Sequence, residues 1–115
     1  MRDVALVAAG ALAIAVAVVH AALLELRVFP KAQIEPRGTR TLLHLVSQLS
    51  TIDWIAVGIL VMAAPAFGSQ ARHWIIAVAA IVYGFAAAAN AAAVRGWHPG
   101  WVLMSCVVVL ALAGL

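Results

Sequence analysis

The chain has 115 residues, of which 67% are hydrophobic and only 10% are charged, with a formal net charge of +3. Soluble domains are roughly 45–50% apolar and about 25% charged, so this composition excludes an ordinary soluble domain as well as a disordered chain. The single cysteine, Cys106, excludes a disulfide scaffold, and no basic stripe interleaved with aromatic residues indicates nucleic-acid binding. We therefore expect an all-α integral membrane protein, a single domain formed by a bundle of four transmembrane helices.

The first two predicted elements are a helix and a charged loop. Residues 4–24 form an uncharged stretch, interrupted only by Gly10 and His20, which is long enough to cross the roughly 30 Å hydrocarbon core. Asp3 weakens the basic region that a signal peptide requires, so we interpret this stretch as a transmembrane helix. Residues 27–40 carry two prolines and most of the charge, which predicts a loop.

Three further spans follow, at residues 41–64, 73–94 and 98–115. The second has a polar first half, the third is rich in alanine, and the fourth is short enough to need the preceding turn or a thinned bilayer. The third span also carries small residues at a spacing of four, which predicts close helix packing through Ala80, Gly84, Ala88 and Ala92.

The distribution of basic residues predicts the orientation. Five of the seven lie in the first and third connections (Arg27, Lys31, Arg37, Arg40 and Arg95), whereas Arg2 and Arg72 lie on the opposite side. Cytoplasmic loops are enriched in Lys and Arg. We therefore expect a multi-pass protein of a bacterial-type inner (plasma) membrane with both termini outside.

Polar residues of different spans are expected to meet on the cytoplasmic side of the bundle. The end of the first helix, the start of the second, the end of the third and the start of the fourth share that side in any four-span bundle. The predicted ligand or metal candidates are His20, His44, His98 and Glu25, and the other polar residues of the pocket are Ser47, Gln48, Thr51, Asp53, Tyr83 and Asn90. Because His20 and His44 have matched depths, we expect them in one cavity or one polar network.

The second span carries the clearest polar pattern. Positions 44, 47, 48 and 51 share one face of a helix, and groups of this kind point into the bundle or hydrogen-bond across helices. Asp53 lies half a helical circumference away from His44, near the membrane centre, where an isolated charge is costly. We expect its carboxyl group to accept a hydrogen bond from Tyr83, unless Asp53 faces a second subunit.

Three functions fit these residues. Two imidazoles on facing helices can hold a transition metal or haem iron, or else frame a small hydrophobic ligand, although no metal-binding motif is present on any single helix. The alternatives are an accessory subunit of a membrane complex and a small oligomeric proton-coupled transporter that uses Asp53. The expected partners are the lipid bilayer and either further copies of the chain or other subunits.

Short motifs carry two resemblances. Over most of its length the chain resembles small bacterial four-span membrane proteins of uncharacterised function. The motifs that carry this resemblance are His20-Ala-x-x-x-Glu25, Leu43-His44-Leu-x-Ser47 and Trp97-His98-Pro-Gly-Trp101. The chain also resembles styrene oxide isomerase, a longer four-span enzyme that uses haem as a Lewis acid. That resemblance implies a haem ligand at His44, with Tyr83 and Asn90 in the pocket.

Overall fold

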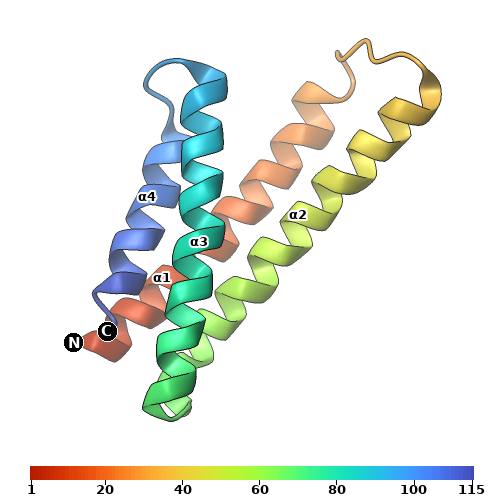
Figure 1. Cartoon of the computed structure of the whole chain (residues 1–115). Helices are drawn as coiled ribbons and strands as arrows, with labels where there is room; N and C mark the ends of the chain where they lie inside the picture. Colours follow the sequence, from red (N-terminus) through yellow and green to blue (C-terminus); the bar gives the residue numbers. More distant parts are fainter.

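The computed structural model describes all 115 residues and consists of helices and turns, with no strands. In chain order the elements are α1 (Arg2–Leu23), the π-helical turn η1 (Leu24–Val28), α2 (Arg37–Ala63), the 3-10 turn η2 (Ala64–Ala66), α3 (Ser69–Val94) and α4 (Pro99–Leu112). Successive helices run in opposite directions, so the two termini lie at the same end of the molecule (Figure 1). The structure confirms the predicted all-α, four-helix fold class.

Three of the four helices are long and apolar enough to cross a membrane: Arg2–Val28, Arg37–Ala66 and Ser69–Val94. α4 has 14 residues, which at 1.5 Å per residue reach about 21 Å and fall short of a roughly 30 Å hydrocarbon core. Only 18 of the 115 residues are buried, so most large aliphatic side chains lie on the outer surface of the bundle. Three helices thus meet the length criterion, one fewer than predicted.

Helix extends into both ends of the segment 27–40 that we predicted as a loop. η1 continues the first helix to Val28, and α2 begins at Arg37, directly after Pro36 at its N-cap. The non-helical connection therefore comprises only residues 29–36. The physical reason is that hydropathy marks the edge of the membrane core, whereas helices end where caps and prolines interrupt their hydrogen bonding.

The helices pack tightly only in the half of the bundle that contains the two termini, which we call the closed half. Its core contains one continuous cluster of buried side chains: Leu6, Ala9, Ala13, Val61, Ala64, Ile76, Ala79, Tyr83, Ala86, Ala87, Met104, Val107 and Ala111. α1 crosses α2 at two glycines, where a Cβ atom added to Gly10 would lie 2.4 Å from the carbonyl oxygen of Gly58. Backbone contact at this point requires both residues to lack a side chain.

A partly buried guanidinium group closes the end of this half. Arg72 at the start of α3 donates two hydrogen bonds, of 3.0 and 2.7 Å, to the carbonyl oxygen of Gly114. It also pairs with the Asp3 carboxylate of α1 at 2.7 Å. One side chain thereby connects α3 to both ends of the chain.

The small-residue ridge predicted on α3 is not its packing face. A Cβ atom added to Gly84 would meet nothing within 4 Å, and Ala88 is exposed. The buried face contains Ala79, Tyr83 and Ala87, which follow the same spacing one residue earlier. Small residues recur every four positions on several faces of this alanine-rich helix. The face that packs against the other helices is not the one that we predicted.

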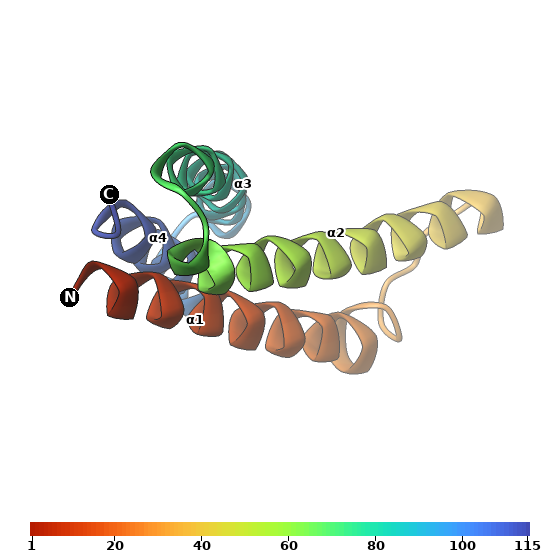
Figure 2. The ribbon, with the colours of Figure 1, turned by 90° about the horizontal axis from the view of Figure 1, so that it is seen from below.

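At the other end of the bundle, the α1–α2 pair diverges from the α3–α4 pair, as Figures 1 and 2 show. We call this the open half; it contains η1, the loop 29–36, the first half of α2, the end of α3 and the turn that precedes α4. α2 contacts α3 less than it contacts α1. This divergence places His20, Asn90 and His98 along the walls of a cleft instead of in a packed core.

Candidate functional site

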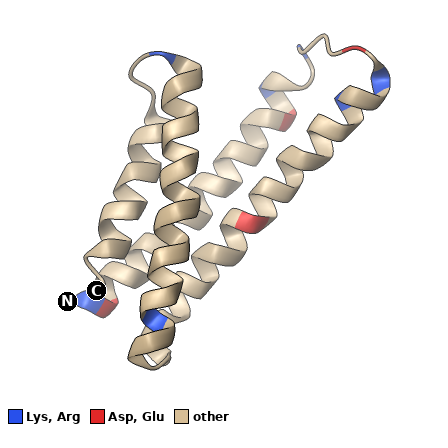
Figure 3. Cartoon of the chain, viewed as in Figure 1, with Lys and Arg blue, Asp and Glu red and all other residues tan.

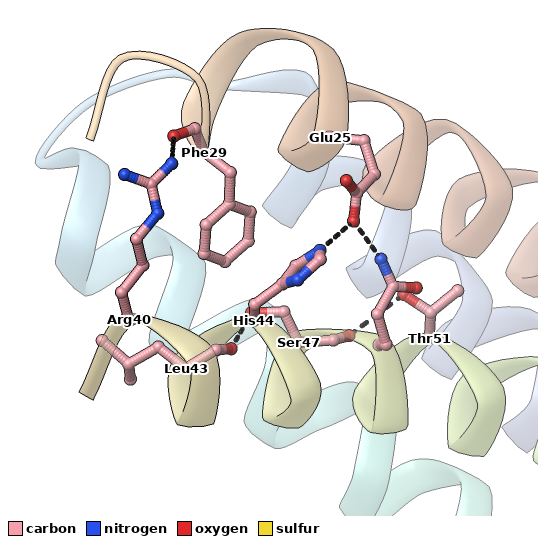
Figure 4. A network of polar contacts seen from close by, with 8 residues as sticks. Glu25, Phe29, Arg40, Leu43, His44, Ser47 and Thr51 are labelled. Carbon is pink, nitrogen blue, oxygen red and sulfur yellow. Dashed lines mark hydrogen bonds and ion pairs between the residues drawn. The ribbon is translucent and has the colours of Figure 1, made fainter. Parts of the chain in front are cut away.

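Several of the predicted polar residues form two separate groups. The first joins η1 to the start of α2, where the Nε2 atom of His44 lies 2.5 Å from the Oε1 atom of Glu25 (Figure 4). The same carboxylate oxygen accepts a hydrogen bond from the side-chain amide of Gln48. Because 44 and 48 are one turn apart, both side chains reach a single acceptor on the neighbouring helix.

The loop packs directly over this group. The ring of Phe29 lies 4.7 Å from the ring of His44, measured between centroids. Arg40 donates to the carbonyl oxygens of Phe29, at 2.7 Å, and Ala32, at 3.3 Å. The side chains of His44 and Glu25 both remain 42% exposed, so this group is not a buried site. It joins η1 to the start of α2 at the surface, and we call Glu25, His44 and Gln48 the surface clamp.

The second group lies in the cleft of the open half, around His20, Trp54 and Asn90. Two cavities share these three residues: one of about 400 Å³ is bounded further by α4, and one of about 520 Å³ by α2 and α3. The rings of His20 and Trp54 lie 5.1 Å apart between centroids, at an angle of 38°. His20 and His44 therefore occupy different sites, and they share neither of the arrangements that we predicted, one cavity or one polar network.

Several hydrogen-bonding groups of the cleft have no partner within the chain. His20 makes no hydrogen bond, and Asn90 uses only its amide nitrogen, which donates to the carbonyl oxygen of Ala86 at 2.9 Å. His98 caps α4 by accepting from the backbone N–H of Gly100 at its Nδ1 atom, at 3.0 Å. In the neutral tautomer this leaves a donor at Nε2. The cleft thus offers both donors and an acceptor on an otherwise apolar wall.

The hydroxyl groups of α2 do not bind across helices. Ser47 donates to the carbonyl oxygen of Leu43 at 2.8 Å, and Thr51 donates to that of Ser47 at 3.2 Å. A serine or threonine on a helix can reach the carbonyl four residues earlier, and here this local bond satisfies the hydroxyl group. Of the two alternatives that we predicted, Ser47 and Thr51 thus point into the bundle and do not hydrogen-bond across it.

Asp53 lies on the outer surface of α2, away from both groups. It is exposed, makes no hydrogen bond and lines neither cavity of the cleft. Tyr83 is fully buried and donates to the backbone carbonyl oxygen of Trp54 at 2.7 Å, so the predicted bond between Tyr83 and Asp53 is not formed. Adjacent positions on a helix point about 100° apart, which separates the carbonyl of Trp54 from the side chain of Asp53.

The side chains are not arranged as a metal centre. No three His, Cys, Asp or Glu residues lie close enough to hold a metal ion together. The residues that the resemblance to styrene oxide isomerase assigns to a haem pocket do not share a cavity either, because His44, Tyr83 and Asn90 lie in the surface clamp, the core and the cleft, respectively. This arrangement does not fit haem ligation by His44, whose Nε2 atom is bonded to Glu25.

Sequence reasoning missed the central role of Trp54 in the cleft and that of Arg72 at the termini. A signal existed for Trp54, since it lies far from either end of its helix, whereas Trp74, Trp97 and Trp101 lie near helix ends or in a turn. No local pattern identified Arg72, because its partners lie 69 and 42 residues away.

No protein-family model matches the chain, and neither the curated proteins nor the solved structures contain a significant match to it. The geometry of the two polar groups and of the cleft is therefore the only indication of what this protein binds.

Proposed function

We propose that this chain is an integral membrane protein that binds a small, mainly apolar molecule in the cleft of its open half. The ligand carries one hydroxyl or carbonyl group, which hydrogen-bonds to His20, Asn90 or His98. The observation that supports this proposal is the pair of cavities on either side of His20, Trp54 and Asn90. Ligand sites are typically concave, about 300–1,000 Å³ in volume and apolar, with a few polar groups that orient the ligand.

The composition of the cavity wall supports the chemical class of the ligand. Leu12, Val16, Leu103 and Met104 line the cavity of about 400 Å³ beside the polar residues. A strongly charged ligand would lose its hydration here without gaining a charged partner, because no Lys, Arg, Asp or Glu lines either cavity. An apolar molecule with one polar group satisfies both parts of the wall.

Binding can be measured through Trp54 with 4-bromophenol, a small aromatic probe whose bromine atom quenches tryptophan fluorescence. A variant with Trp74, Trp97 and Trp101 replaced by Phe retains Trp54 as its only tryptophan. We expect saturable quenching in detergent. Removal of the unpartnered imidazole in His20→Leu should weaken binding at least about threefold, the scale of one hydrogen bond.

Two alanines on α1 provide a matched control for the cavity. Ala15 lines it and Ala11, one turn earlier, does not. Ala15→Leu should reduce probe binding by filling the cavity, whereas Ala11→Leu should bind like the parent protein. Quenching that rises linearly with probe concentration, or that is equal in the two variants, would contradict the proposal.

The proposed orientation has the loop between α1 and α2 in the cytoplasm, which the five-to-two distribution of basic residues supports. Single cysteines at Gln33, in this loop, and at Gln70, at the opposite end of the bundle, distinguish the two orientations in a Cys106→Ala background. On intact cells an impermeant thiol reagent should label Gln70→Cys and leave Gln33→Cys unlabelled. The reverse pattern would invert the orientation.

A further inference from the structure

Asp53 is the one acidic residue in the middle of a helix; all other charged residues lie near helix ends (Figure 3). Its carboxyl group points away from the bundle and has no hydrogen-bond partner in the chain. In a bilayer, a polar group on the outside of a helix at this depth requires a partner, because lipid chains offer no donor or acceptor. The chain alone leaves this requirement unmet.

The face around Asp53 has the pattern of a helix–helix contact. Exposed residues recur at alternating spacings of four and three along α2, at Leu42, Val46, Leu49, Asp53, Ala56 and Leu60. This repeat, which averages 3.5 residues, is the one that keeps two long helices in contact along a left-handed crossing. A single polar residue within such an apolar repeat fixes the register of the two helices.

The remaining outer surface of the chain indicates what can face Asp53. At the same depth, the exposed residues of α1 and α3 are apolar, and those of α4 add only the thiol of Cys106, a weak donor. The polar side chains of Ser105 and Tyr83 at mid-helix are already bonded within the chain. The strongest donor and acceptor that this surface offers at the required depth is Asp53 itself.

We propose that α2 pairs with α2 of a second copy in the same orientation, about a twofold axis that passes close to Asp53. A residue near a twofold axis meets its own counterpart, so the two carboxyl groups face each other. In their uncharged form, each can donate its O–H to the other and accept in return. α2 can make this contact because the residues of this face are exposed along the helix and no other element of the chain covers them.

Disulfide cross-linking in native membranes tests the pairing. In a Cys106→Ala background, Leu49→Cys and Ala56→Cys place single thiols on the proposed face one turn to either side of Asp53. Val78→Cys is the control, an exposed position of α3 that is nine residues from the start of its helix, as Asp53 is ten from the end of α2. We expect covalent homodimers at 49 and 56 and few at 78.

The role of the carboxyl group is tested in the same assay. Asp53→Asn keeps a donor and an acceptor and should preserve cross-linking, whereas Asp53→Leu should lower its yield at least about fivefold by removing the only polar contact. Equal yields at 49, 56 and 78 would indicate random collision and overturn the proposal. A cross-linked product with the mass of a different protein at 49 and 56 would replace the second copy by another subunit, and also overturn it.

Discussion

The closed and the open half of this bundle contain the same helices but differ in what holds them together. In the closed half, glycine, alanine and buried aliphatic residues bring the backbones into contact, and one partly buried guanidinium group joins three chain segments. In the open half, two helix pairs diverge, and an exposed cluster of Glu25, His44 and Gln48 joins only one of these pairs. Packing thus provides rigidity at one end and leaves room for a ligand at the other.

The comparison explains where polar residues can remain unpartnered. His20 and Asn90 retain free hydrogen-bonding groups because the cleft keeps them only half-buried. In both halves every fully buried side-chain polar atom has a partner, so unpartnered groups occur only where a side chain is at least partly exposed. A protein that binds a ligand between helices needs such an asymmetry, since a uniformly packed bundle has no space and a uniformly open one has no fixed geometry.

The largest effect is expected at the glycine contact of the closed half. Gly10→Ala places a methyl group 2.4 Å from the carbonyl oxygen of Gly58, and this overpacking should lower the free energy of unfolding by about 1–3 kcal/mol. Gly84→Ala meets nothing and should stabilise α3 through helix propensity. Thermal unfolding in detergent measures both. Equal losses in the two variants would mean that the contact is unimportant.

A slightly smaller effect is expected from the two arginines that bind backbone carbonyls, one in each half. Arg72→Ala removes charge-assisted bonds from a side chain 19% exposed, but its Asp3 partner is 64% exposed and screened by water, so the loss should be about 1–2 kcal/mol. Arg40→Ala removes comparable bonds from an exposed guanidinium group and should cost less. Chemical denaturation of both variants gives the comparison. A greater loss in Arg40→Ala would place the stabilising contacts in the open half.

The hydroxyl group of Tyr83 marks the boundary between the two halves. Tyr83→Phe keeps the buried ring but removes the bond to the carbonyl oxygen of Trp54, and should cost about 0.5–1.5 kcal/mol. Ser105→Ala removes a bond made within α4 and should change stability less. If Tyr83→Phe is neutral in thermal unfolding, the bond does not help to hold α2 against α3.

The smallest effect is expected in the turn of the open half. Arg95 ends α3 with a φ of 50°, in the left-handed region that disfavours side chains. Arg95→Gly should therefore raise the free energy of unfolding by about 0.5–1 kcal/mol, and Arg95→Lys should leave it unchanged. Differential scanning calorimetry of the two variants resolves the difference. Stabilisation by Lys as well would show that the gain in Arg95→Gly does not come from relief of backbone strain, because Lys retains the Cβ atom.

Much of the candidate site was predictable, but its division into two was not. Helical spacing correctly placed His44 and Gln48 on one face and Asp53 on the opposite one. Matched depth suggested that His20 and His44 meet, yet the two imidazoles point to different neighbours. Depth fixes only one coordinate, whereas contact also depends on the rotation of each helix about its axis.

The sequence by itself determined the all-α class, the number of helices and the apolar character of their surfaces, because hydropathy and helical period are local properties of a chain. Only the tertiary structure decided which small residues touch, that Arg72 joins the termini and that the bundle opens around His20 and Trp54. These features depend on crossing angles and helix rotations. Such quantities arise from the simultaneous packing of segments that are distant in the chain, and no local pattern encodes them.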